Sequence, residues 1–132
     1  MAIEIIGTGK AVPQQKVSND DLAARVDTCD EWIRSHTGIG NRHFAEDGIA
    51  ASDLALEAAK NALAMAAGFS GDGLGERDRI AAEEAKNIDI IILGTVTADY
   101  MGCPSTACIV QGKLGAEKAG AMDISAGCTG FI

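Results

Sequence analysis

Cys128 is the residue whose surroundings in the sequence most favour chemistry. It follows a strand-sized run, residues 120–124, and small residues flank it in Ser125-Ala126-Gly127-Cys128-Thr129-Gly130. A thiol on a strand-to-helix turn is held out from the backbone, and the free N–H groups of a helix that starts there would stabilise a thiolate or bind an oxyanion. The pattern predicts a cysteine nucleophile, and a buried cysteine in a tight glycine turn is the alternative.

The remaining thiols and imidazoles do not form a metal-binding pattern. The four cysteines include no C-x-x-C pair, and His36 and His43 are not arranged as H-E-x-x-H. We therefore expect no metal site and, for a cytosolic protein, no disulfide framework. The other cysteines are expected to act mostly as small buried hydrophobes, and they are Cys29, Cys103 and Cys108.

The charge and the glycine pattern argue against two classes of binding protein. A formal net charge of −8 is unsuited to a broad nucleic-acid surface, which needs clustered Lys and Arg. Gly7 and Gly9 invite a dinucleotide-loop interpretation, but Val12 stands where the third glycine of G-x-G-x-x-G belongs. No P-loop motif is present either, so no nucleotide cofactor is expected.

The sequence has no targeting or membrane signal. The first residues lack a basic region followed by a long apolar stretch, as a signal peptide would have. No segment approaches the roughly 18 apolar residues of a membrane span. We expect a soluble, cytoplasmic protein without a membrane partner.

Strand-like and helix-like segments alternate along the chain, which predicts an α/β fold with a mainly parallel sheet. The expected strands are residues 3–6, 88–94 and 120–124. The second is apolar enough to be a parallel strand buried on both faces. In such sheets the chemistry lies at the carboxyl ends of strands, and Cys128 lies just past one.

Capping signals place two short helices early in the chain. Ser18 or Asn19 can cap a helix that extends to Val26, with acidic residues in its first turn. Thr28 and Glu31 fit a capping box, in which the hydroxyl and the carboxylate each satisfy a free backbone N–H. The sequence therefore predicts a second helix starting beside Thr28.

The second helix carries Trp32, the only tryptophan, and should stop near Gly38. A longer helix is predicted over residues 51–66, and another opens with Pro104 in its first turn and stops at Gly115. Small residues on the apolar face of the long helix would let it lie close to a sheet. That face consists of Ala51, Leu54, Ala55, Ala58, Ala62, Met65 and Ala66, with Asp53, Glu57, Lys60 and Asn61 opposite.

Residues 69–87 differ from the segments on either side. The first part is glycine-rich, and the second is charged and alanine-rich. We expect a surface loop followed by a short exposed helix.

Four motifs, in order along the chain, resemble β-ketoacyl-acyl-carrier-protein synthase III. They are Ile5-Ile6-Gly7-Thr8-Gly9 with Pro13; Asp27-Thr28-Cys29-Asp30-Glu31-Trp32-Ile33 with Thr37-Gly38-Ile39 and Arg42-His43; Pro104-Ser105-Thr106-Ala107-Cys108; and Asp123-Ile124-Ser125-Ala126-Gly127-Cys128-Thr129-Gly130-Phe131. They cover nearly the whole chain, and residues 69–87 match least and resemble an insertion.

The resemblance implies a thiolase-like fold. Residues 1–132 would form the amino-terminal half of a duplicated, layered α/β/α/β/α architecture with a mostly parallel sheet core. The family's catalytic His and Asn lie in the carboxy-terminal half, which is absent from this chain. We therefore expect the activity to belong to a longer parent protein and the chain alone to be inactive.

The resemblance also implies a decarboxylative Claisen condensation that initiates fatty-acid synthesis. A short acyl-CoA would load its acyl group onto Cys128, and the carbanion from malonyl-acyl-carrier protein would attack the acyl-cysteine. Covalent storage divides one hard step into two easier ones. Acyl-CoA acts as a substrate, no further cofactor is required, and the family works as a homodimer.

Binding roles carry over to four further positions. Trp32 matches the tryptophan that stacks on the CoA adenine, with a core aromatic as the alternative. His36 stands where the family often has a CoA-gripping arginine, and imidazole is a weaker phosphate partner than guanidinium. Arg34 is a possible substitute for that arginine. Cys103 stands where the family places a residue that caps the acyl pocket across the dimer interface, or it is a turn cysteine without that role.

Three other functions fit parts of the sequence. A related polyketide or quinolone-type priming enzyme would differ in acyl and acceptor specificity. A cysteine hydrolase with a nucleophile elbow would need G-x-C-x-G, but Ala126 departs from it. A non-catalytic half-domain for dimerisation or partner binding would not need Cys128.

Overall fold

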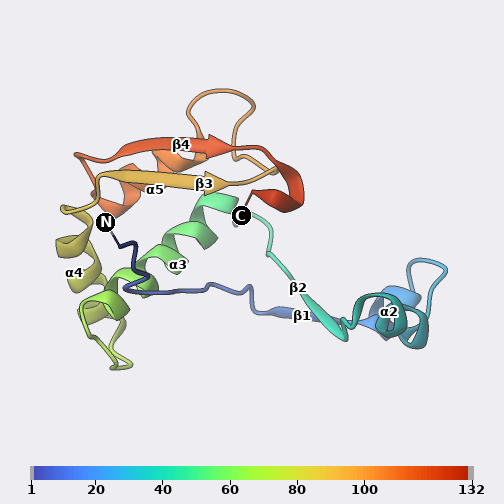
Figure 1. The fold of residues 1–132 in the computed structure, drawn as a ribbon. Coiled ribbons are helices and arrows are strands. Elements are labelled where there is room, and N and C mark those ends of the chain that lie inside the picture. The colour runs from blue at the N-terminus through green and yellow to red at the C-terminus, as the bar shows by residue number, and fades with distance from the viewer. Residues whose placement is uncertain (1, 131–132) are drawn as a thin grey trace. The chain divides into compact units, whose positions relative to one another are not determined.

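The computed structural model describes residues 2–130 (Figure 1). Phe131, the last residue of the cysteine motif, lies outside this range. The chain divides into two compact units, and each is described by itself. The first unit comprises the described residues up to Ala11 together with those from Ala50 onward, and the second comprises Val12–Ile49.

The second unit is a pair of antiparallel strands with two helices between them. Strand β1 (Gln15–Ser18) pairs with β2 (Asn41–Phe44), so that Gln15 lies opposite Phe44. Helices α1 (Asn19–Ala23) and α2 (Asp30–Thr37) connect the strands. Neither strand was expected from the sequence, because each is only four residues long and its pairing partner is more than 20 residues away.

The caps of these helices differ in part from the expectation. Ser18 caps α1 through a reciprocal pair of bonds with Asp21, but the helix ends at Ala23 and does not reach Val26. Helix α2 begins one residue later than expected, with Cys29 at its N-cap position, and this cap has no side-chain hydrogen bond. The predicted capping box of Thr28 is therefore wrong, because Thr28 lies one position outside the helix.

The first unit is built on two parallel strands. Strand β3 (Ile90–Gly94) pairs in register with β4 (Gly120–Ile124), with Ile90 beside Gly120. Helix α5 (Thr106–Leu114) connects them and packs against both. Pro104 precedes the N-cap, Ser105, and so lies outside the first turn of α5 where it was expected. Gly115 ends the helix in a left-handed conformation, as predicted.

Helix α3 (Ala51–Ala66) has the predicted bounds but contacts neighbours on several sides. A second apolar face of α3, which was not predicted, carries Leu56, Ala59 and Leu63. These side chains pack against the core around Leu114. The predicted small-residue face instead receives the N-terminal segment. A Cβ atom at Gly7 would clash with the backbone of Ala62, so only glycine permits this close approach. Met65 stays exposed although the N–H of Thr8, in this segment, lies 3.4 Å from its sulfur.

Helix α4 (Leu74–Ala85) forms within the segment expected to be an insertion. It packs along α3, and Ala81 and Ala85 are fully buried there. The expectation of an exposed helix therefore holds only for its outer face. Because alanine side chains are short, the two helices approach closely enough for their charged side chains to interlock at the edge of the contact.

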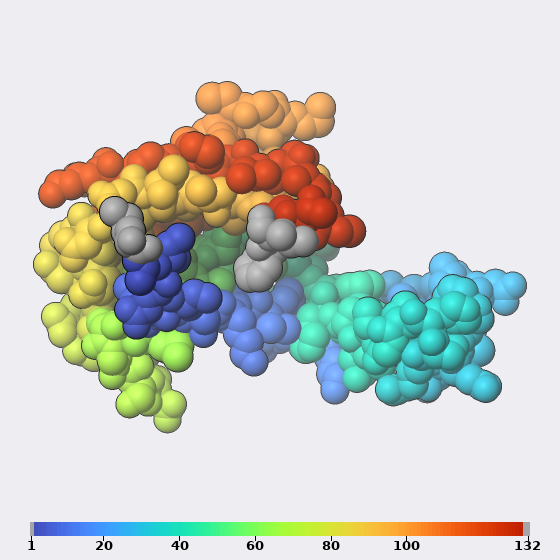
Figure 2. All heavy atoms as spheres, in the orientation of Figure 1, coloured from blue at the N-terminus to red at the C-terminus, as the bar shows by residue number. Residues whose placement is uncertain are grey.

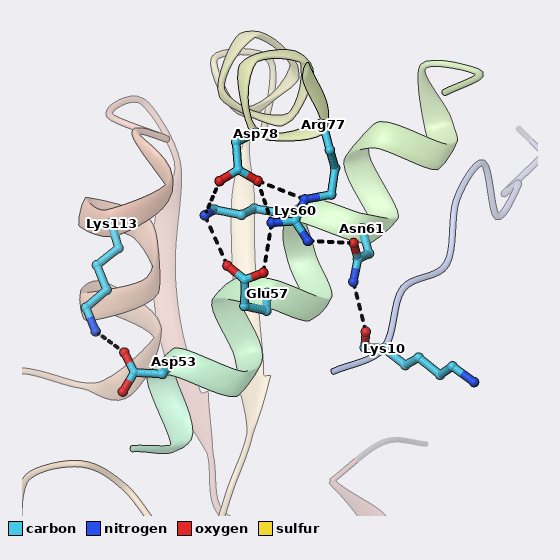
Figure 3. Close-up of polar contacts among 8 residues, drawn as sticks. All are labelled: Lys10, Asp53, Glu57, Lys60, Asn61, Arg77, Asp78 and Lys113. Carbon is cyan, nitrogen blue, oxygen red and sulfur yellow. Dashed lines mark hydrogen bonds and ion pairs between the residues drawn. The ribbon is translucent and has the colours of Figure 1, made fainter. Parts of the chain in front are cut away.

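An ionic network joins α3 to α4 (Figure 3). Arg77 donates from Nη2 to Glu57 at 2.8 Å and from Nη1 to the amide oxygen of Asn61 at 3.0 Å. Lys60 bridges Glu57 and Asp78 at 3.1 and 2.9 Å. The Arg77 side chain is only 12% exposed, so these bonds are better shielded than ordinary surface pairs.

One expected strand is absent, and another is less buried than expected. Residues 3–6 have no strand conformation, and the side chains of Ile3, Ile5 and Ile6 are 72–98% exposed. A strand exists only where its backbone groups pair with a neighbour, and these residues pair with neither β3 nor β4. The same segment lies at the surface of the space-filling view, in dark blue (Figure 2).

Strand β3 is covered on one face only. Its residues alternate between exposed and half-buried, and Ile90 and Ile92 are 50% and 54% exposed. On β4, Met122 lies opposite Ile92 and Ile124 lies opposite Gly94, and both are also exposed. The predicted burial of β3 on both faces is wrong for residues 2–130, where helices pack on one side of the strand pair. No helix in this part of the chain is long and apolar enough to cross a membrane.

Candidate active site

Cys128 lies in a single tight turn after β4. The turn is a 3-10 helix over Gly127–Thr129, and Gly127 has a φ of 54°, a left-handed conformation that favours glycine. Thr129 donates to the carbonyl oxygen of Ala126 from its hydroxyl, at 2.7 Å, and from its backbone N–H. The thiol of Cys128 is exposed and free. The predicted placement of this thiol on a turn after a strand is confirmed.

The turn is held directly against the end of β3. The N–H of Thr95 donates to the carbonyl oxygen of Ile124 at 3.1 Å. A Cβ atom at Gly94 would lie 2.6 Å from the carbonyl oxygen of Gly130. Because real Cβ atoms do not approach an oxygen so closely, the end of β3 accepts the cysteine turn only with glycine at position 94.

Asp123 ties the cysteine-bearing strand to helix α5. Its two carboxylate oxygens accept the backbone N–H groups of Thr106 and Ala107, at 2.8 and 2.7 Å. These are free donors at a helix start, where a negative charge is also favoured by the helix dipole. We did not assign this role from the sequence. The available signal was a lone carboxylate inside the otherwise apolar run of β4.

The loop that precedes α5 carries Cys103. This loop, residues 95–105, projects from the strand pair and is drawn in orange (Figures 1 and 2). Cys103 is exposed, and the peptide bond between it and Pro104 is cis. Tyr100 and Met101 are also exposed on this loop. Asp99 fixes its base by accepting the backbone N–H of Ser52 at 3.1 Å.

Trp32 lines a depression in the second unit. The depression has a volume of about 330 Å³, and the side chains around it belong to Asp27, Thr28, Cys29 and Trp32. The indole is 56% exposed within the part of the chain that the structure describes. The hydroxyl of Thr28 is buried and has no hydrogen-bond partner among the described residues. A buried polar atom without a partner is costly to the fold.

Arg34 is bound within its own unit. Its Nε lies 2.8 Å from both carboxylate oxygens of Asp30. Its guanidinium also packs on Gly40, where a Cβ atom would come within 2.7 Å of both terminal nitrogens. Hydrogen bonds from Asn19 and then Arg34 hold the pKa of Asp30 below its usual value. Arg34 therefore connects the start of α2 to the loop that follows the helix.

His36 stacks on Trp32. The two ring centroids are 4.3 Å apart, with an angle of 23° between the ring planes. The Nδ1 atom of His36 lies 2.8 Å from the carbonyl oxygen of Trp32 and 3.1 Å from the hydroxyl of Ser35. His36 thus lies on a face of the indole, and Trp32 and His36 form one paired group on α2. Cys128 belongs to the other compact unit and is described separately.

Metal-ligating side chains do not gather in the part of the chain that the structure describes. Among residues 2–130, no three His, Cys, Asp or Glu side chains are placed to hold a metal ion. The cysteines at 29, 103, 108 and 128 are all free and exposed. The expectation that the other thiols are mostly buried is therefore wrong, because Cys29 is the N-cap of α2, Cys103 lies in a loop and Cys108 lies in the first turn of α5.

The chain is similar in sequence to one group of curated proteins. It is 46% identical over 128 residues to β-ketoacyl-[acyl-carrier-protein] synthase III of Xylella fastidiosa, an alignment that covers 97% of this chain and 35% of that protein. It is also 46% identical over its whole length to the protein of the same name from Geobacillus kaustophilus, of which it covers 37%. The chain thus spans about a third of the length of these relatives. No family model matches it.

Solved structures agree with the sequence comparison. The chain superposes on 3-oxoacyl-[acyl-carrier-protein] synthase III from Aquifex aeolicus with a TM-score of 0.80 and 40% identity, covering 98% of this chain and 37% of that one. It also superposes on the priming β-ketosynthase of the R1128 polyketide pathway, with a TM-score of 0.79 and 28% identity, covering 97% and 34%. The predicted fold class is therefore confirmed: this is an amino-terminal portion of the thiolase-like α/β fold.

Proposed function

We propose that this chain, which corresponds to an amino-terminal portion of β-ketoacyl-[acyl-carrier-protein] synthase III, supplies the acyl-accepting half of that enzyme's active site. The observation that carries the proposal is the exposed, free thiol of Cys128 on a glycine-containing turn at the carboxyl end of β4. In parallel α/β sheets this edge is where reactive groups are placed.

The reaction begins with transfer of an acyl group to sulfur. The Cys128 thiolate attacks the carbonyl carbon of a short acyl-CoA, the bond to the CoA sulfur breaks, and CoA leaves as a thiolate that takes up a proton. Malonyl-acyl-carrier protein then loses CO2, and its carbanion attacks the acyl-cysteine, which releases the Cys128 thiolate. The family's His and Asn, which serve the second step, lie beyond the region that this chain matches.

The partners follow from the same proposal. They are an acyl-CoA, malonyl-acyl-carrier protein and a second copy of the protein, and the compartment is the cytoplasm. The projecting loop of residues 95–105 would carry Cys103 to the acyl pocket of the other copy. Because cysteine is small, this loop would restrict the length of the primer less than a bulky aromatic residue would.

Trp32 is proposed to receive the adenine of CoA. The exposed indole and its place in the lining of the depression support this role. Arg34 is less suited to hold a CoA phosphate, since its guanidinium is already bound to Asp30 and packed on Gly40. His36 is the other basic residue in the last turn of the helix.

A second candidate is the priming of a polyketide. The superposition on the priming β-ketosynthase, at 28% identity, favours keeping it. The two functions use the same acyl-cysteine and differ in the acyl group and the acceptor. A comparison of acyl-CoA primers and carrier proteins from the two pathways would separate them.

The experiment that tests the proposal is covalent labelling of the complete gene product with radiolabelled acetyl-CoA, followed by peptide mapping. The label is expected on Cys128, and Cys128→Ala should abolish both labelling and condensation with little change in fold. Cys108→Ala is the matched control, since that thiol is also free and exposed but lies on α5. Label on Cys29, Cys103 or Cys108 in the unaltered protein would reject the assignment.

A further inference from the structure

We propose that His36 is a positioning residue for Trp32, holding the indole as a platform for the ligand's base, and that it does not act as a phosphate ligand. The inference rests on the proposed CoA role of Trp32 and changes what is expected of the residue beside it. It assigns the specificity of this site to an aromatic base at the end of a thioester carrier.

The stacked geometry supports a platform. The ring centroids of His36 and Trp32 lie 4.3 Å apart with 23° between the ring planes, so the imidazole stacks on one indole face. Stacked pairs of this kind are favourable beyond the surface they bury. Since both residues are on α2, one helical turn apart, the pair is held by the helix itself. The opposite face of the indole remains for a second ring, because Trp32 is 56% exposed.

The hydrogen bonds of His36 argue against a phosphate contact. A carbonyl oxygen can only accept, so the Nδ1 atom that faces the carbonyl oxygen of Trp32 carries the proton of the neutral ring. The Nε2 atom of that tautomer is an acceptor and offers no hydrogen to a phosphate oxygen. The hydroxyl of Ser35 reinforces the arrangement, since it donates to the same carbonyl at 3.0 Å and can accept from Nδ1.

Arg34, the neighbouring cation on α2, is not free to bind a phosphate. Arg34 is engaged by Asp30 and therefore does not compete for the face of the indole. The depression beside Trp32 has a volume of about 330 Å³, which leaves room for a flat ring against the indole. With Arg34 bound to Asp30 and His36 stacked on Trp32, this part of α2 offers an aromatic face for the base of the carrier more than a cation for its phosphates.

Three ligands separate the two roles. We would measure equilibrium binding of acetyl-CoA, acetyl-dephospho-CoA and acetyl-4′-phosphopantetheine to the complete gene product by calorimetry. The Cys128→Ala background prevents acyl transfer during the titration, and all variants and ligands are compared in the same buffer. His36→Gln removes the ring and keeps a hydrogen-bonding side chain, while His36→Phe keeps a ring that can stack. Trp32→Ala is measured in parallel.

A platform predicts one pattern of affinities. His36→Gln should weaken the binding of acetyl-CoA and of acetyl-dephospho-CoA by the same factor. We expect about 2- to 12-fold, because the loss of an aromatic stack lowers affinity by about that much. His36→Phe should restore most of the affinity for both. The affinity for acetyl-4′-phosphopantetheine, which lacks the base, should be the same in all three proteins.

Other patterns overturn the inference. If His36→Gln and His36→Phe weaken acetyl-CoA equally and leave acetyl-dephospho-CoA unaffected, His36 binds the 3′-phosphate. If Trp32→Ala weakens the binding of acetyl-CoA and neither His36 variant does, the platform role of His36 is wrong, while the proposed CoA role of Trp32 stands. If Trp32→Ala changes no affinity, the proposed CoA role of Trp32 fails, and the platform role fails with it.

Discussion

The carbonyl oxygen of Gly130 lies 2.6 Å from the position that a Cβ atom would take at Gly94. This contact joins the end of β3 to the turn that presents Cys128. Both sides of the contact are backbone, so neither can move aside as the tip of a flexible side chain could. The position of the thiol therefore depends on a residue 34 positions earlier in the chain.

Gly94→Ala should accordingly impair acylation of Cys128. The added methyl group must push the turn away from β3, and such overpacking costs about 1–3 kcal/mol in the free energy of unfolding. We expect the rate of Cys128 labelling by acetyl-CoA to fall by an order of magnitude or more. Gly120→Ala on the adjacent strand is the control, because its nearest neighbours lie at 3.9 Å. Equal labelling rates in the two variants would show that the contact does not position the thiol.

Trp32→Ala should raise the KM for acyl-CoA much more than it slows the chemistry of an enzyme already loaded with acetyl groups. Stacking is a binding interaction, and by analogy with bases stacked on aromatic residues in single strands it contributes about 1–3 kcal/mol, or roughly 5- to 150-fold. Trp32→Phe keeps a smaller ring, so its KM for acyl-CoA should lie between those of the unaltered protein and Trp32→Ala. Steady-state kinetics and single-turnover condensation check the two halves of this prediction, and an unchanged KM would leave Trp32 with no part in CoA binding.

Arg77→Met should destabilise the first unit by about 1–3 kcal/mol, because it leaves partly buried partners on α3 without their hydrogen bonds. Arg79→Met is the matched control on the same helix, since the pair of Arg79 with Glu76 is exposed on both sides. Urea unfolding followed by far-ultraviolet circular dichroism measures the difference. The prediction fails if the two variants are equally stable.

The same comparison has a predicted pH dependence. Hydrogen bonds from Lys60, and then from Arg77, lower the pKa of Asp78 from its ordinary value of 3.8. A carboxyl group whose pKa is lower in the folded state stabilises the protein above the unfolded value and loses this effect as the pH falls through the folded one. The free energy of unfolding of the unaltered protein should therefore exceed that of Arg77→Met by the full amount at neutral pH. This difference should shrink as the pH falls below 3.8.

The 132-residue chain by itself should be inactive in condensation and should self-associate. Four apolar side chains on one face of the strand pair are 39–54% exposed, and they belong to Ile90, Ile92, Met122 and Ile124. Exposed apolar surface of this kind favours association, and the isoleucines of residues 3–6 add to the exposed apolar side chains of this unit. Gel filtration and an acyl-transfer assay on this chain check the prediction.

A variant pair tests the cause of that association. Ile92→Thr keeps a β-branched residue on the exposed face and should reduce self-association. Ile91→Thr, on the covered face, should destabilise the fold instead, because Ile91 packs against the core around Leu114. A stable, cooperatively folding monomer of the unaltered chain would contradict the burial argument.

The sequence predicted best what depends on local pattern. The bounds of α3 and β4 and the left-handed glycine at the end of α5 follow from periodicity and from capping chemistry, which act over a few residues. The strand-to-turn placement of Cys128 also followed, because a small-residue run directly after an apolar strand leaves few other conformations.

What the sequence did not predict depends on partners distant in the chain. The pairing of β1 with β2 and the failure of residues 3–6 to form a strand are decided by which backbone groups meet, and no local pattern encodes that. Helix α3 was assigned a single apolar face, whereas its alanines receive Gly7 and Gly9 while its leucines face the core. The roles of Asp123 and Arg34 emerged only when their partners were in place.

The division of the chain into two compact units has a consequence for how its unfolding can be followed. Trp32 is the only tryptophan, and it lies in the unit formed by Val12–Ile49, so tryptophan fluorescence, excited at about 295 nm to avoid Tyr100, reports on that unit alone. Most of the helical signal in circular dichroism comes instead from α3, α4 and α5 in the other unit. The two spectroscopic probes therefore observe different parts of the molecule, and their midpoints coincide only if both units melt in a single all-or-none transition.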